Sequence, residues 1–238
     1  IYLFNESGEE RSKKGRTILN QRYHIGQTGE GTNNIKEIFG LRLFDNPKPL
    51  SLIKYLIKLS KSSGIVMDFF SGSGTTAHAV MELNLDDLKN RKFIGIQMPE
   101  LVDEKSIAFK NNFKLISDIS KERIRRVIKK IKEENKQEKL NSKQNQDLGF
   151  KVFKLTKSNY KIWEDVKDET KLKEQLKLFE DPLVENYKDI DVIYEIIIKE
   201  GYSLNSEITE MSTKPNKIYK VSDGEFFFYV TLDEKIDE

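Results

Sequence analysis

The chain has 238 residues, 37% of them hydrophobic and 34% charged, with a formal net charge of +2, as expected for a soluble chain of one or two domains. It has no cysteine and only two histidines, which excludes disulfides, thiolate nucleophiles, Cys-based zinc sites and multi-histidine metal sites. No apolar run approaches the ~20 residues of a membrane span, so we expect no membrane partner and a cytoplasmic location.

The first segment, residues 1–34, is rich in Gly, Asn, Ser, Arg and Lys. This composition predicts a loop with one edge strand at Ile1–Phe4. The first residue is Ile rather than Met, and no signal-peptide pattern follows it. We therefore expect the chain to begin inside a longer reading frame.

Residues 34–97 carry the pattern of an α/β fold. A short helix ends at Gly40, a turn with two prolines holds Lys48 in an extended path, and helical apolar spacing follows over 50–59. The apolar runs "GIVMDFF" and "RKFIGIQ" flank a predicted helix at 75–85 and are typical of strands buried on both faces of a parallel sheet. Strand, helix and strand in this order predict a βαβ unit.

The rest of the chain is predicted to be helical and then mixed. Residues 103–141 have a helical pattern in which Ser120 is a candidate cap. A polar linker at 141–147 precedes a small α+β domain at 148–238, with a strand near 150–155, a helix ended by Gly201 and a hairpin at Asp223-Gly224.

The stretch "DFFSGSGTT" (68–76) joins the first predicted strand to the helix and is a candidate nucleotide-type turn. A P-loop is excluded because no lysine follows the glycines. A dinucleotide fingerprint is formally met by Gly72, Gly74 and Ala77. The position expected to be acidic at the end of the next strand is Gln97, however, and Glu100 is the nearest carboxylate.

S-adenosylmethionine is the third candidate for this turn. The donor carries a free ammonium group and no pyrophosphate, so a carboxylate at the strand end suits it, and Asp68 stands at that point. Phe70 could wall one side, while Gly72 and Gly74 keep the backbone close to the ligand. The carboxylate before the turn favours this interpretation over the dinucleotide one.

The segment "FDNPKPLSLIKYLIKLSKSSGIVMDFFSGSGTTAHAVMELN" with "NRKFIGIQMPE" resembles the cofactor-binding half of adenine-specific DNA methyltransferases, in particular the Mod subunit of type III restriction-modification systems. "ISKERIRRVIKKI" and "GFKVFKL" resemble the segments that follow. The resemblance implies a Rossmann-like methyltransferase sheet over 35–140 and a target-recognition remnant over 1–34. It also implies a donor site formed by Lys48, Asp68, Phe70, Gly72, Gly74, Thr75 and Gln97.

The resemblance also shows what is missing. The family's catalytic loop, Asp-Pro-Pro-Tyr or a close variant, precedes the cofactor segment, and this chain has no Pro-Pro pair. We therefore expect no catalytic residue here and a C-terminal methyltransferase fragment that is inactive alone. The alternative is a non-catalytic subunit that binds DNA or partners; an NAD-dependent oxidoreductase is a more distant one.

Double-stranded DNA, a second Mod subunit and the restriction (helicase–nuclease) subunit are the partners that the resemblance implies. Seven Lys or Arg residues against one Glu between 121 and 132 suggest phosphate contact by Arg123, Arg125, Arg126 and Lys129, although such faces are often only solvated. Trp163 and the run Phe226–Val230 are either a base-stacking platform or, as we expect, core.

Overall fold

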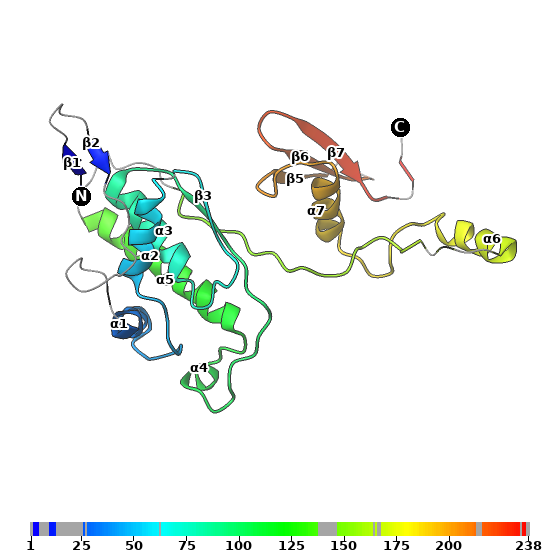
Figure 1. The fold of residues 1–238 in the computed structure, drawn as a ribbon. Coiled ribbons are helices and arrows are strands. Elements are labelled where there is room, and N and C mark those ends of the chain that lie inside the picture. Colours follow the sequence, from blue (N-terminus) through cyan, green and yellow to red (C-terminus); the bar gives the residue numbers. More distant parts are fainter. Residues whose placement is uncertain are drawn as a thin grey trace. The chain divides into compact units, whose positions relative to one another are not determined.

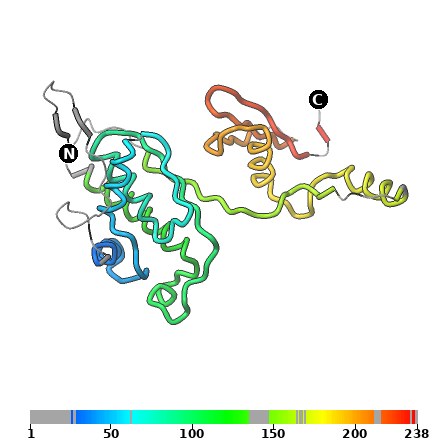
Figure 2. Tube along the Cα trace, viewed as in Figure 1, coloured from blue at the N-terminus to red at the C-terminus, as the bar shows by residue number. Residues whose placement is uncertain are grey.

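The computed structural model describes residues 2–4, 10–12, 26, 28–61, 63–137, 147–163, 165, 168–212, 216–233 and 235–236. The chain divides into two compact units, Ile1–Lys151 and Val152–Glu238. Figure 2 traces their order along the chain.

The first unit combines helices with a small parallel sheet. Its elements in chain order are β1 (Tyr2–Phe4), β2 (Glu10–Ser12), α1 (Thr28–Phe39), α2 (Leu50–Leu59), β3 (Ile65–Asp68), α3 (Thr75–Asp87), β4 (Lys92–Gly95), α4 (Ile107–Lys110) and α5 (Ile116–Gln137). β1 pairs antiparallel with β2. Helix α3 packs between α2 and α5 (Figure 1).

Helix α1 begins earlier than its sequence pattern predicts. Residues 28–33, expected to be loop, are helical although Gly29 and Gly31 lie among them. A Cβ on Gly31 would lie 2.0 Å from the carbonyl oxygen of Pro47, so glycine is what lets the helix approach this turn. Glu30 accepts hydrogen bonds from the backbone N–H and the hydroxyl of Ser51, which ties α1 to the start of α2.

The predicted βαβ unit is present. β3 and β4 are parallel neighbours, with Ile65 opposite Lys92 and Asp68 opposite Gly95, and α3 connects them. One face of the pair packs on the helices through Val66 and Phe93, which contact a core cluster formed by Leu50, Ile57, Ala79, Val80 and Leu83. A mixed α/β architecture with a small parallel sheet therefore follows.

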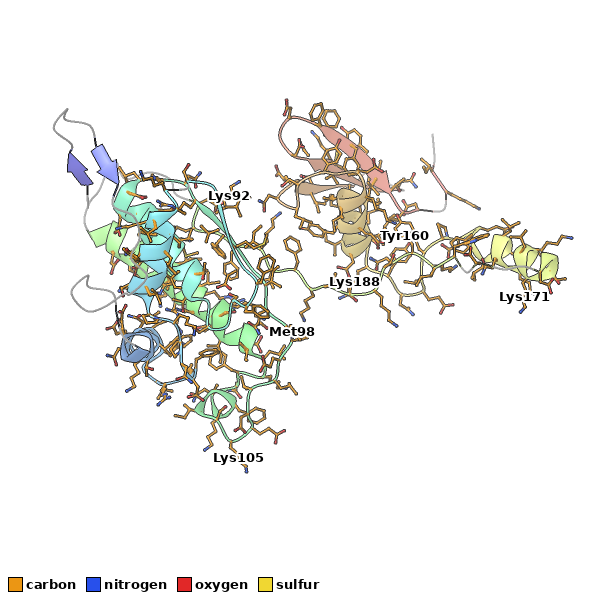
Figure 3. All side chains as sticks on the ribbon, viewed as in Figure 1. Lys92, Met98, Lys105, Tyr160, Lys171 and Lys188 are labelled. Carbon is orange, nitrogen blue, oxygen red and sulfur yellow. The ribbon has the colours of Figure 1, made fainter. Side chains whose placement is uncertain are left out.

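The second face of this sheet differs from the prediction. Ile65, Met67 and Ile94 point away from the helices and are 61%, 47% and 40% exposed. In Figure 3, Lys92 marks the start of β4 and Met98 lies beyond its end. The expectation of strands buried on both faces is wrong for the described residues, because no further element of the unit covers this side.

The predicted long helix after residue 103 is two helices. A turn at residues 111–115 separates α4 from α5, and Asn112 has a positive φ of 67° there. Ser120 is not the cap. It lies in the second turn of α5, where its hydroxyl donates to the carbonyl oxygen of Ser117, while Asp118 accepts from the N–H of Leu115 at the helix start.

The second unit is built on a three-stranded antiparallel sheet in the order β5-β6-β7, with bounds Glu207–Ser212, Lys217–Ser222 and Phe227–Thr231. Helix α7 (Asp189–Lys199) covers one face, and α6 (Glu169–Leu178) precedes it. The core cluster contains Ile193, Ile197, Tyr219 and Val221. The predicted hairpin at Asp223-Gly224 and the helix before Gly201 are both confirmed.

Two predictions about this region fail. Residues 150–155 form no strand, and Leu148 and Phe150 pack against α5 in the first unit. The aromatic run on β7 is only partly core: Phe228 and Val230 pack on the α7 cluster, whereas the other aromatics are exposed, namely Phe226, Phe227 and Tyr229, together with Trp163 on the preceding segment.

Within the described residues, no helix has the length and apolar character to cross a membrane. The same residues contain no cluster of three or more His, Cys, Asp or Glu side chains that could hold a metal ion.

Candidate donor-binding site

The turn between β3 and α3 has a backbone that only glycine adopts without strain. Gly72 has a φ of +50° and Gly74 a φ of +77°. A Cβ on Gly72 would touch the ring of Phe44 at 3.4 Å, and one on Gly74 would lie 3.2 Å from the Cβ of Ser120. The glycines therefore serve both the turn and its close packing on two neighbouring segments.

Asp68 stands at the carboxyl end of β3 and is half-buried. Its carboxylate accepts the backbone N–H of Phe70 at 3.1 Å and the hydroxyl of Thr76 at 2.6 Å. A carboxylate has about four acceptor sites, so these two bonds orient the group without saturating it. The side chain is thus fixed between the strand and the first turn of α3.

Gln97 lies two residues beyond β4 and joins the turn from the neighbouring strand. Its side-chain oxygen accepts the N–H of Gly72 at 2.8 Å. The backbone continues the pairing here, because Ile96 donates to Asp68 and Ser71 donates to Ile96. The structure therefore brings Gln97 to the turn as a partner of its backbone.

The other predicted donor-site residues are placed unequally. Thr75 begins α3, is buried, and its hydroxyl lies 3.4 Å from the carbonyl oxygen of Lys48. The side chain of Lys48 is exposed, so its backbone, rather than its ammonium group, contacts the turn in this structure. Phe70 is 81% exposed at the outer side of the turn.

Arg123, predicted to contact DNA, lies in the interior of the first unit. Its side chain is fully buried, with an exposed fraction of 0%. Nη1 donates to the hydroxyls of Ser73 and Thr75, at 3.1 and 2.7 Å, and lies 3.4 Å from the carbonyl oxygen of Ser73. Arg123 therefore faces the glycine turn and is not presented to DNA.

A buried charge network continues from Arg123 into α3 and α2. Nη2 of Arg123 donates to Nδ1 of His78 at 3.2 Å, and Nε2 of His78 lies 2.9 Å from Glu82. Because arginine only donates, Nδ1 must accept and Nε2–H must donate, which is the neutral imidazole. Glu82 also accepts from Nζ of Lys54 at 2.9 Å.

The pKa values in this network agree with that protonation state. Burial lowers the pKa of His78, and the charges of Arg123 and Lys130 lower it further against the opposing effect of Glu82. Burial alone would raise the pKa of Glu82, but the hydrogen bond from His78 and the hydrogen bond and charge of Lys54 lower it below its usual value. Burial lowers the pKa of Arg123 to about 10, which keeps it charged at neutral pH.

The remaining predicted DNA-binding residues lie on the outer side of α5. Each has an acidic residue of the same helix nearby. Arg125 and Arg126 both form ion pairs with Glu122, and Nζ of Lys129 lies 3.9 Å from the carboxylate of Glu133. Arg126 also donates to the carbonyl oxygen of Ile38 and stacks on the ring of Phe39 in α1. Acidic neighbours thus offset part of the charge run.

Sequence reasoning missed three residues that support the turn: Phe44, Ser120 and Arg123. Ser120 and Arg123 lie three positions apart, so both lie on the same face of α5. The buried side of α5 is otherwise lined by Ile and Val. A small residue and an arginine at this spacing on that side are the sequence feature that indicates a polar contact there. It does not identify the partner, which lies about fifty positions earlier.

Comparisons with known proteins find DNA methyltransferases that are similar to this chain. Residues 4–108 match a family model described as DNA methylase. The chain is 39% identical to the Mod subunit of the type III restriction-modification enzyme StyLTI of Salmonella typhimurium, over 154 residues that are 64% of this chain and 23% of that protein. It is 37% identical to the EcoP15I Mod subunit of Escherichia coli over 150 residues, 57% and 21% of the two chains.

A type II methyltransferase, M.KpnI of Klebsiella pneumoniae, is also similar, with 38% identity over 125 residues that are 52% of this chain and 30% of that protein. The chain spans less than a third of the length of each of these relatives. Together these matches confirm the resemblance to Mod-type adenine DNA methyltransferases.

Proposed function

We propose, from this relationship to Mod-type methyltransferases, that residues 35–140 form the part of a DNA adenine methyltransferase that binds S-adenosylmethionine. One observation carries the proposal: an oriented carboxylate, Asp68, lies at the end of a parallel strand directly before a glycine turn that opens α3. The carboxyl ends of parallel strands are where α/β folds bind their ligands.

The residues at the turn fit the donor chemically. The two remaining acceptor sites of Asp68 suit the ammonium group of the methionine part. The exposed ring of Phe70 offers an apolar surface, and the amide group of Gln97 can donate to a ribose hydroxyl. Lys48 lines the approach to the turn. When bound, the donor supplies an electrophilic methyl group on a sulfonium.

The dinucleotide alternative is less well supported. A ribose of that ligand requires an acceptor at the end of the second strand. The oxygen of Gln97 already accepts the N–H of Gly72, and a pyrophosphate would approach the carboxylate of Asp68. These two features favour the methyl donor over NAD.

The exposed face of β3 and β4 supports a larger, Rossmann-like sheet in the full enzyme. Ile65, Met67 and Ile94 are apolar side chains of the kind that a doubly covered parallel sheet buries. We infer that elements of the longer polypeptide cover this face and add strands beside the pair.

Transfer of the methyl group to adenine in double-stranded DNA, pairing with a second Mod subunit and assembly with a restriction subunit are part of the same proposal. The chain contains no Pro-Pro pair, so an Asp-Pro-Pro-Tyr-type loop must come from residues outside it. We therefore expect the 238-residue chain alone to bind the donor and not to methylate DNA.

Isothermal titration of the 238-residue chain with S-adenosylmethionine, S-adenosylhomocysteine and NAD tests the donor site. We expect the first two ligands to bind, since both carry the ammonium group, and the Asp68→Asn variant to bind them at least tenfold more weakly. The matched control is Asp191→Asn, an exposed aspartate on α7 of the second unit. Equal binding of NAD, or no effect of Asp68→Asn, contradicts the proposal.

The proposal also includes DNA contact by α5. The residues proposed for this contact are Arg125 and Lys129, whose side chains are 58% and 77% exposed. A double alanine variant at these positions is expected to reduce the slope of log affinity against log salt by about 2, because two phosphate contacts are lost. An unchanged slope would show that Arg125 and Lys129 face solvent and do not contact DNA.

A further inference from the structure

One arginine from another helix binds the buried residues of the glycine turn. Arg123 reaches from α5 to both hydroxyls that flank Gly74, those of Ser73 and Thr75, and all three residues are buried. Ser120, one turn earlier on the same face of α5, contacts Gly74 from below. The buried part of the turn is therefore held against α5.

Burying a guanidinium is costly, and an apolar side chain of similar volume could fill the same space. The structure offsets the cost in a specific way. Neutral His78 accepts one N–H of Arg123, and Glu82, which is negative and held by Lys54, balances the charge through the imidazole. The Nε atom of Arg123 is buried without a hydrogen-bond partner, so the network is not fully satisfied.

The planar fork of arginine supplies what an apolar residue lacks. Its donors point in fixed directions, so two hydroxyls and an imidazole nitrogen are held at set positions. Ser73 and Thr75 flank Gly74, the residue with the largest φ in this turn. Restraining both flanks restrains the backbone that the donor must approach.

We propose that Arg123 is a positioning residue for the donor site, which fixes the turn Ser73–Thr75 in its ligand-ready conformation before S-adenosylmethionine binds. The inference rests on the proposed function and extends it to a residue that does not touch the donor. A turn that is already ordered loses less conformational entropy when the donor binds. Arg123 therefore raises the affinity for the donor without touching it.

The test compares Arg123→Met, which fills the volume without donors, and Arg123→Lys, which keeps a charge and some donors. Ser73→Ala removes one acceptor with a minimal change of shape. Lys132→Met is the control, because Lys132 is an exposed cation of the same helix. Hydrogen–deuterium exchange of peptides across residues 68–78 reports the turn directly, and titration with S-adenosylmethionine reports its consequence.

We expect Arg123→Met to speed exchange in this segment at least tenfold and to weaken donor binding by a similar factor. Arg123→Lys and Ser73→Ala should have smaller effects in the same direction, and the control should have none. Unchanged exchange at the turn in both Arg123→Met and Ser73→Ala, or acceleration spread evenly over the unit, overturns the proposal. If the unaltered chain binds no donor, the proposed function fails, whereas the exchange comparison still decides the role of Arg123.

Discussion

The contact between Gly74 and α5 gives the sharpest prediction. Substitution of Gly74 by Ala places a Cβ 3.2 Å from the Cβ of Ser120 and 3.3 Å from its Cα and carbonyl oxygen. If the backbone of α5 moved away, Ile124 and Val127 on the same side would lose their packing on α3. The substitution also puts a non-glycine residue at a φ of +77°.

The expected loss of stability in Gly74→Ala is the sum of these two effects. A left-handed conformation costs a non-glycine residue about 1–2 kcal/mol. Forcing a methyl group into a packed contact costs about 1–3 kcal/mol more. Gly40 is a matched control, since its φ is +76° and a Cβ there would meet nothing within 4 Å. Gly40→Ala should therefore show only the first of these costs.

Urea or thermal unfolding of the 238-residue chain and the two variants measures the difference. We expect Gly74→Ala to reduce the free energy of unfolding by roughly 2–5 kcal/mol and Gly40→Ala by about 1–2 kcal/mol. Gains from restricting the unfolded chain are similar in both variants and cancel in the comparison. Equal losses in the two variants would refute the argument that α5 packs on the turn.

Three further predictions concern the same unit. His78→Gln keeps one acceptor and one donor but does not titrate; because the pKa of His78 is lowered on folding, the native chain should lose stability as the pH falls below about 6.5, and thermal melts of the variant should show a flatter decline. Gln97→Ala removes the acceptor for the N–H of Gly72 and should cost about 1 kcal/mol and weaken donor binding, whereas Gln97→Glu, which keeps an acceptor, should retain most of the stability; identical urea midpoints for the two variants would count against the bond. Ile94→Lys places a charge on the exposed sheet face and should reduce self-association in sedimentation runs without lowering the melting temperature, and a large loss of stability would show that this face is packed.

Local patterns in the sequence were sufficient for the central elements of the first unit. The apolar runs before and after "SGSGTT" predict β3, α3 and β4 because strand and helix periodicities depend on neighbouring residues. The acidic residue before two glycines predicted the candidate donor site, since both signals lie within a few positions. The start of α1 was missed because Gly31 reads as a breaker until Pro47 is seen against it.

The sequence by itself determined the β3–α3–β4 unit, the position of the glycine turn and the family that the chain resembles. Only the tertiary structure decided that Arg123 faces the turn rather than DNA, that Gln97 binds the backbone of Gly72, and that one face of β3 and β4 is open. The physical reason is distance along the chain. A basic residue on a helix has the same local pattern whether it meets water or a hydroxyl fifty positions away, and only packing of α5 on α3 distinguishes the two.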